Sequence, residues 1–190
     1  KYMKVNRILP IINNVKNLKS APEVAFKGDS YEIGIDISSR LEFPYNVLSN
    51  FAQTSFELDG VQINSMEGFL QSLKTHDPEK QKETCKLVGL KAKGMGKKHN
   101  KERQKYGHKD LNYLYWQGQK IKRDSKEYQE LLKRAYQARY DADDNFRFAL
   151  EYTKGRVLKH TMGCPEMKKT VLTRDEFTNI LTELRDNNKY

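Results

Sequence analysis

The spacing of apolar residues separates a short strand-forming region from a longer helical region. Apolar and polar residues alternate over Tyr31–Ile37, which predicts a strand. Two further alternating runs, Ser55–Leu58 and Val61–Ile63, flank Asp59-Gly60, and this dipeptide is the strongest short signal for a β-hairpin. We therefore expect a small antiparallel sheet near the N-terminal third of the chain.

Helical signals begin directly after this hairpin. Asn64 or Ser65 can cap a helix that runs to about Lys74. Asp77-Pro78 then opens a second helix, because proline is favoured at the first helical position. The core stripe of the first helix consists of Met66, Phe69, Leu70 and Leu73.

The C-terminal part of the chain predicts three more helices. One begins at Ser125, one runs from about Ala142 to near Gly155, and one begins at the capping box Thr173–Glu176. Short strands are predicted at Val157-Leu158 and Val171-Leu172. The helix from Ser125 has an apolar side made of Tyr128, Leu131, Leu132, Ala135 and Tyr136.

Together these elements predict a mainly helical α+β domain with a small antiparallel sheet. The 190 residues fit one domain that is long enough to bury a core. We expect this domain to span residues 31–190. Residues 1–30 lack a sustained period and contain Pro10 and Pro22, which predicts an N-terminal arm.

The chain is basic, with 35 Lys and Arg residues against 25 Asp and Glu residues and a net charge of +10. Such a surplus favours polyanions such as nucleic acid, nucleotides or an acidic membrane surface, although it also serves solubility alone. No apolar run approaches the roughly 18 residues of a membrane span. Cys85 and Cys164 have no CxxC partner and are expected to be reduced. We therefore expect a cytoplasmic protein without a membrane partner; the sequence names no protein partner.

Many of the basic residues lie between Lys91 and Lys109, where Glu102 is the only acidic residue. Gly94 and Gly96 interrupt this stretch. Because glycine disfavours helix, we expect a mobile basic loop or a frayed helix rather than an ordered charged face. The predicted nucleic-acid contacts within it are Lys97, Lys98 and Lys101.

Most short catalytic motifs are absent. The chain has no GxGxxG, Walker loop, HExxH or paired CxxC, so dinucleotide redox chemistry, P-loop hydrolysis and a standard zinc site have no support. The histidines, which show no metal-ligand spacing, are His76, His99, His108 and His160. We expect His99 and His108 to be solvated, and we expect neither a metal nor an organic cofactor.

The helix predicted from Asn64 carries a polar face. Glu67, Gln71 and Lys74 fall within about 60° of one another and about 115° from the apolar stripe. Gly68 costs the helix about 1 kcal/mol relative to alanine and permits close approach of a ligand or backbone. A structural alternative is that Glu67 completes a cap at Asn64 and Lys74 favours the helix dipole.

Several segments resemble the NADAR/YbiA-like family, in order and at consistent spacing over roughly residues 33–185. That family is associated with hydrolysis of N-glycosidic bonds in riboflavin-pathway intermediates, in ADP-ribose derivatives and in ADP-ribosylated guanine of DNA. The resemblance implies a YbiA-like fold. It rests on Leu48–Phe51, Phe56–Gly60, Ser65–Lys74, Trp116–Gln119, Ser125–Tyr128, Leu158–Gly163 and Val171–Thr173.

The resemblance implies roles for individual residues. The family's catalytic glutamate and lysine match Glu67 and Lys74, and its base-stacking aromatic residue maps to Trp116. A lone tryptophan that follows Tyr113 and Tyr115 is equally well explained as part of the core. The implied substrate-binding residues are Arg40, Ser49, Asn50, Phe51, Gln71, Trp116 and His160.

The chain departs from the riboflavin-linked branch of that family at two places. The branch has a histidine directly after the glutamate, where this chain has Gly68. The branch also has an acidic residue followed by Trp-Gly late in the chain, where this chain reads Lys159–Gly163. Both differences favour ADP-ribose-type substrates.

The resulting hypothesis is an N-glycoside hydrolase that cleaves the ribosyl C1–N bond of ADP-ribose-type substrates, such as ADP-ribose on guanine in DNA or a related nucleotide. Glu67 would stabilise positive charge on the sugar and orient water. Lys74, with a pKa lowered by burial, would capture the ring-opened C1 as a Schiff base. Asn50 would bind ribose hydroxyls and Gln71 would position the sugar. The alternative is a non-catalytic module that binds ADP-ribose or nucleic acid.

Overall fold

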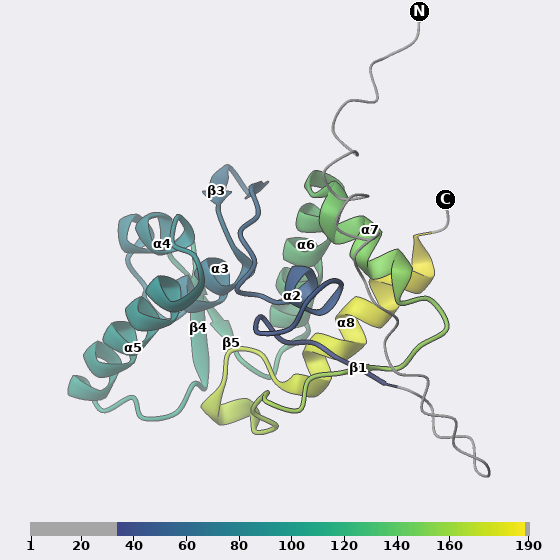
Figure 1. The fold of residues 1–190 in the computed structure, drawn as a ribbon. Helices are drawn as coiled ribbons and strands as arrows, with labels where there is room; N and C mark the ends of the chain where they lie inside the picture. The colour runs from purple at the N-terminus through teal and green to yellow at the C-terminus, as the bar shows by residue number, and fades with distance from the viewer. Residues whose placement is uncertain (1–33, 189–190) are drawn as a thin grey trace, which may run out of the picture. The chain divides into compact units, whose positions relative to one another are not determined.

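A computed structural model describes residues 34–188 (Figure 1). The predicted arm, residues 1–30, and the start of the strand predicted over Tyr31–Ile37 lie outside the described residues, so the domain boundary stays a prediction. In chain order the elements are β1 (Ile35–Asp36), α2 (Tyr45–Leu48), β2 (Phe56–Leu58), β3 (Val61–Ile63), α3 (Met66–Ser72), α4 (Pro78–Cys85), α5 (Gly89–Lys105), β4 (Tyr113–Trp116), β5 (Gln119–Lys122), α6 (Lys126–Ala142), α7 (Asp144–Tyr152), β6 (Leu158–Lys159), a 3-10 turn (Met167–Lys169) and α8 (Arg174–Asn187).

The strands of the described chain form three separate pairs. β2 and β3 pair antiparallel around Asp59-Gly60, and β4 and β5 pair antiparallel around Gln117-Gly118. All four turn residues have positive φ, the region that glycine enters without steric cost. β1 and β6 pair in parallel, with Ile35 opposite Leu158. The α+β class and the antiparallel pairing are confirmed, and the parallel pair was not expected.

Helix starts follow the signals in the sequence. Ser65 caps α3, Asp77 caps α4 with Pro78 in the first turn, and Ser125 caps α6. Thr173 forms a capping box at the start of α8. The predicted apolar stripe of α6 is buried in the common core together with the stripe of α3. Short-range capping chemistry therefore fixes where these helices begin, and apolar burial fixes which side faces inward.

The strand predicted at Val171-Leu172 is wrong. Both side chains are buried, but the Val171 carbonyl accepts a hydrogen bond from the Tyr128 hydroxyl. The Leu172 N–H donates to Thr170 Oγ1 at 3.3 Å. The backbone is thus held by side chains rather than by a partner strand.

The basic stretch, predicted as a mobile loop or a frayed helix, forms the continuous helix α5 as far as Lys105, so the prediction of a loop is wrong. Ala92, Gly96 and His99 form its buried side, and their small or polar side chains give no apolar stripe that the sequence could reveal. His99 is only 3% exposed and its Nε2 lies 3.0 Å from Thr84 Oγ1, so its predicted solvation is also wrong. Although α5 and α6 each have 17 residues, no helix within residues 34–188 is long and apolar enough to cross a membrane.

Helix α3 lies at the centre of these contacts. It packs against α4 and α5, while α6 packs against β2, α7 and α8. Figure 1 shows α4 and α5 together beside α3, with α6, α7 and α8 forming a second group. Any polar residue on α3 is therefore enclosed by neighbouring elements.

Candidate active site

Helix α3 is seated through its first turn on the segment between α4 and α5. Ser65 Oγ accepts a hydrogen bond from the Gly68 N–H at 2.9 Å and donates one to the Leu87 carbonyl at 2.8 Å. A Cβ on Gly68 would lie 2.7 Å from the Leu87 oxygen and 2.9 Å from the Cys85 oxygen. Gly68 therefore permits a backbone, not a ligand, to approach the helix, and no larger side chain fits there.

The predicted polar face of α3 is buried as a unit. Glu67, Gln71 and Lys74 are only 8%, 9% and 8% exposed. Gln71 Nε2 donates to Glu67 Oε1 at 2.9 Å. Since Ser65 is the cap and Glu67 is bonded to Gln71, the alternative explanation of Glu67 as a capping partner is wrong.

Burial shifts both titratable groups of this face toward their neutral forms. It raises the pKa of the Glu67 carboxyl, against the Gln71 hydrogen bond and the charges of Lys93 and Lys74. It lowers the pKa of Lys74 to about 8, against the Glu67 charge and with the charges of Arg103 and Lys93. Lys74 forms no ion pair with any side chain of residues 34–188. A carboxyl whose pKa is raised and an amine whose pKa is lowered thus share one enclosed face of α3.

Helix α5 brings two cations to this surface that sequence reasoning missed. A Cβ on Gly96 would collide with Gln71 Oε1, so glycine leaves room for the Gln71 amide where α5 crosses α3. Lys93 and Arg103 lie three residues before and seven after Gly96, on the side of the helix toward α3, and both charges act on Lys74. The helical period counted from Gly96 would have found them.

The segment Leu48–Phe51 borders the buried face, as the resemblance implied. The Glu67 N–H donates to the Asn50 carbonyl at 2.9 Å, and the Tyr136 hydroxyl donates to Asn50 Oδ1 at 2.7 Å. The Lys93 ammonium lies 5.7 Å from the centre of the Phe51 ring. Asn50 and Phe51 are therefore both brought to the site.

Buried Arg139 holds the backbone of this segment through hydrogen bonds to its carbonyl groups. Its guanidinium donates to the Val47 carbonyl at 2.7 Å and to the Ser49 carbonyl at 3.4 Å. Ser49 Oγ in turn accepts from the Phe51 N–H at 3.2 Å. Ser49 is thus positioned as part of the turn, with its hydroxyl engaged in the local backbone.

Trp116 lies in the core rather than on the polar face. It is 5% exposed, and its ring packs edge-on against Phe69 with 5.2 Å between ring centres. Its indole N–H donates to Asp59 Oδ2 at 2.8 Å. Phe69 belongs to the apolar stripe of α3, so the structure does not bring Trp116 to Glu67, and the stacking role fits this geometry poorly.

His160 is connected to the buried face of α3 through other side chains, and Arg40 lies in an exposed turn. His160 Nδ1 is 2.9 Å from the Ile37 carbonyl oxygen, and the ring packs edge-on against Phe177. Phe177 contacts Tyr136, which bonds Asn50, so His160 is linked to the site through two rings. Arg40 is exposed in the turn after β1, and its guanidinium forms no ion pair with the described residues.

Lys97, Lys98 and Lys101 lie on the opposite side of α5 from α3. All three are exposed, and none is paired with an acidic side chain of the described chain. Gly94 shares this side, and a Cβ added there would meet nothing within 4 Å. We call these three lysines the outer ridge; the structure separates them from Glu67 and Lys74.

The side chains of the site offer a carboxyl and an amine. Across residues 34–188, no group of three or more His, Cys, Asp and Glu residues is arranged to hold a metal ion. The buried carboxyl of Glu67 can transfer protons, and the amine of Lys74, with its lowered pKa, can attack a carbonyl-like carbon.

The chain is similar to known proteins in sequence and in fold. Residues 42–186 match the family described as Bacteriophage protein GP30.3. A 17.1 kDa protein of the Gp30–rIII intergenic region of enterobacteria phage T4 is 37% identical over 153 residues, which cover 80% of this chain and 97% of the T4 protein. The NMR structure of the E. coli protein YbiA matches with a TM-score of 0.54 and 17% identity, over 84% of this chain and 86% of YbiA. The chain therefore belongs to the bacteriophage GP30.3 family and has a YbiA-like fold.

Proposed function

We propose that this protein is an N-glycoside hydrolase of the NADAR type that cleaves the ribosyl C1–N bond of ADP-ribose-type substrates, with ADP-ribosylated guanine of DNA or a related nucleotide as substrate. One observation carries the proposal. Lys74 is buried beside Glu67, has no ion-pair partner among the described residues and has a pKa lowered to about 8. Structural lysines are normally exposed or paired, because burying an unpaired ammonium is costly.

The neutral amine of Lys74 suits attack on a sugar carbon. In the proposed reaction the Lys74 nitrogen bonds to C1 as the C1–O4 bond breaks and the ribose ring opens. One proton of this nitrogen passes through Glu67 to O4. Its second proton passes through Glu67 to the leaving nitrogen, and the C1–N bond to the base breaks. Water then adds to the lysine–C1 imine, which releases the sugar with a C1 oxygen from water and restores the amine.

Glu67 serves this route in two ways. Its carboxylate stabilises the positive charge that develops at C1 and on the imine nitrogen. Its raised pKa lets it take up and return a proton more readily near neutral pH than an ordinary carboxyl does. The Gln71 amide, bonded to Oε1, fixes the orientation of the carboxyl.

Two features support an ADP-ribose-type substrate. The riboflavin-linked branch has a histidine after the glutamate, and here the backbone of residues 84–87 leaves no room for any side chain at Gly68. The net charge of +10 and the exposed outer ridge favour a polyanionic substrate such as DNA. The YbiA-like fold is compatible with the reaction class.

The proposal is tested by incubation with single-stranded DNA that carries ADP-ribosylated guanine, with a small ADP-ribosyl nucleoside in parallel. We expect released ADP-ribose, with one ¹⁸O atom at C1 when the reaction is run in ¹⁸O-labelled water. Borohydride added during turnover should attach the sugar mass to Lys74. Lys74→Met should give no adduct, and Lys98→Met, a change on the outer ridge, should give the normal adduct with the small nucleoside.

Two outcomes contradict the proposal in different ways. Release of ADP-ribose without an adduct, together with near-normal activity of Lys74→Met, would leave Glu67 and activated water as the chemistry. Saturable binding of both substrates with no release would instead identify a non-catalytic ADP-ribose or nucleic-acid binding module.

A further inference from the structure

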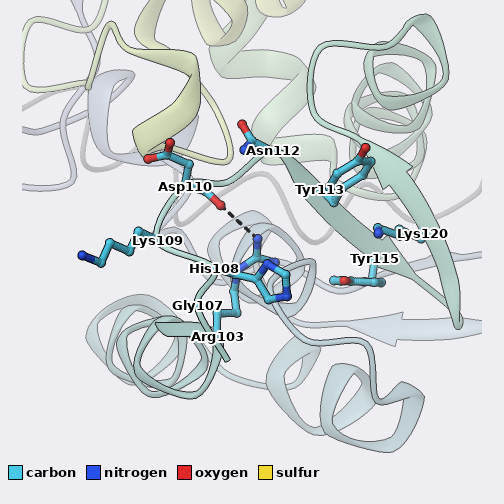
Figure 2. A pocket seen from close by; sticks show the side chains of 9 residues that line it. All are labelled: Arg103, Gly107, His108, Lys109, Asp110, Asn112, Tyr113, Tyr115 and Lys120. Carbon is cyan, nitrogen blue, oxygen red and sulfur yellow. Dashed lines mark hydrogen bonds between the residues drawn. The ribbon is translucent and has the colours of Figure 1, made fainter. Parts of the chain in front are cut away.

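A cavity of about 270 Å³ opens between the C-terminal end of α5 and the β4–β5 hairpin (Figure 2). Arg103 and the turn Gly107–Asp110 line one side of it, and Tyr113, Tyr115 and Lys120 of the hairpin line the other. Its volume lies below the roughly 300–1,000 Å³ of pockets that enclose a whole drug-sized ligand. It is suited to one group of a larger molecule.

The cavity adjoins the end of the buried face of α3. The Tyr115 N–H donates to the Leu73 carbonyl at 2.9 Å, so the strand that lines the cavity is fastened to the residue before Lys74. Arg103, on the other wall, is close enough for its charge to lower the pKa of Lys74. The cavity therefore lies next to the end of α3 that carries Lys74.

The cavity is equipped for an anion. Arg103 Nε is buried without a hydrogen-bond partner, and Nη2 makes only a 3.3 Å bond to the Asp110 carbonyl oxygen. The Lys120 ammonium lies 4.1 Å from the centre of the Tyr113 ring on the facing strand. Figure 2 shows the Asp110 carboxylate directed away from Arg103, so this carboxylate does not pair with the guanidinium. An unsatisfied guanidinium donor is a strong binding site for phosphate oxygens, which accept its hydrogen bonds and match its planar fork.

We infer that this cavity is the phosphate subsite of the protein, in which Arg103 and Lys120 bind the diphosphate that follows the ribose in the substrate. The inference rests on the proposed function for the identity of that ribose. The phosphate chemistry itself follows from the cavity. Arg103 would anchor the phosphate through its free Nε and Nη groups, and Lys120 would neutralise the second charge. Binding there would hold C1 within reach of Lys74.

Equilibrium binding of inorganic diphosphate, ADP-ribose and a short unmodified single-stranded oligonucleotide tests the subsite, since none of these measurements needs turnover. In Arg103→Met, the Kd for diphosphate and for ADP-ribose should rise about tenfold or more, because a charge-assisted pair of hydrogen bonds is lost. Arg103→Lys should recover part of the affinity, since it keeps the charge without the fork. Exposed Lys120→Met should weaken the binding of both ligands by about threefold, and Lys91→Met, at an exposed position of α5 away from the cavity, should weaken neither. Thermal unfolding of each variant checks that the fold is retained.

The same binding measurements on Glu67→Gln separate the phosphate subsite from the proposed function, because this variant changes the carboxyl of the proposed reaction and keeps Arg103 and Lys120. If diphosphate binding depends on Arg103 but the wild-type protein cleaves no N-glycoside, the phosphate subsite is supported and the proposed function is contradicted. Cleavage that proceeds with unchanged Kd and KM in Arg103→Met and Lys120→Met would overturn the subsite alone. If Arg103→Met loses affinity for the oligonucleotide but not for ADP-ribose, the diphosphate subsite is also overturned, because the cavity would then bind a phosphate of the DNA backbone.

Discussion

The two sides of helix α5 carry similar basic side chains in different surroundings. On the inner side, Arg103 is partly buried with an unsatisfied donor, and its charge acts on Lys74. On the outer side, Lys97, Lys98 and Lys101 are exposed to water. Water and salt screen exposed charges beyond about 8 Å at physiological ionic strength, whereas partly buried charges are screened much less. Arg103 can therefore tune a reactive group, and the outer lysines serve to attract a charged partner.

This difference predicts two separable sets of effects. Changes in residues at the inner side of α5 should alter the turnover of every substrate or the stability of the protein. Changes on the outer ridge should alter only the binding of polymeric substrate.

The largest effect is expected at Glu67, which the inner side of α5 encloses. Glu67→Gln removes the charge with little change in shape, so turnover should fall by about 10²–10⁴-fold while ligand affinity and the unfolding temperature stay near normal. Single-turnover kinetics and calorimetric binding on the same variant measure both. Normal turnover in Glu67→Gln would show that the carboxylate takes no part in the chemistry.

Trp116 tests whether strand β4 contributes to binding or to the core. Because the ring is buried against Phe69 and bonded to Asp59, Trp116→Ala should lower the free energy of unfolding by about 3–5 kcal/mol. The affinity of the folded fraction for ADP-ribose should not change. A variant of normal stability that binds about 1–3 kcal/mol more weakly would instead restore the base-stacking role.

Gly94 and Gly96 form a matched pair on the two sides of α5. Gly96→Ala would push Gln71 away and break its bond to Glu67, which should cost about 1–3 kcal/mol of stability and lower turnover. Gly94→Ala enters open space and should stabilise the helix by up to about 1 kcal/mol. Chemical denaturation and turnover of the two variants decide this; equal behaviour would contradict the close crossing of α5 and α3.

The pH dependence of turnover reports on the inner cations. Since the pKa of Lys74 is lowered to about 8, the neutral amine increases as pH rises through that value, and Glu67 also ionises with rising pH. Turnover should therefore climb by about tenfold per pH unit below the midpoint and level off above it. Arg103→Met removes a charge that lowers this pKa, so the midpoint should move to higher pH, and Lys98→Met should leave it in place. A flat profile would exclude a titrating lysine.

The smallest effect is expected from the outer ridge. Reversal of Lys97, Lys98 and Lys101 to glutamate should weaken binding of modified DNA. It should also flatten the dependence of log K on log salt by about 0.7 for each lost contact with single-stranded DNA and about 0.9 with duplex. Cleavage of a small ADP-ribosyl nucleoside should hardly change. Equal losses on both substrates would make the ridge part of the site or of folding, and no loss on either would make it solvated surface only.

The sequence by itself determined the parts of the fold that depend on neighbouring residues. The Asp59-Gly60 turn, the Ser65 and Ser125 caps and the capping box at Thr173 lie where they were predicted. The polar face of α3 also followed from the helical period alone. Each of these features is encoded within a few residues of chain, so no knowledge of distant segments is needed.

Only the tertiary structure decided how those elements surround the site. Helix α5 buries alanine, glycine and histidine instead of an apolar stripe, so its order comes from packing at Gly96 rather than from its own pattern. The same crossing brings Lys93 and Arg103 to Lys74, while Trp116, which the sequence left open, lies against Phe69 in the core. These outcomes depend on contacts between residues far apart in the chain. Burial shifts the pKa values of Glu67 and Lys74, and it exists only once those contacts are made.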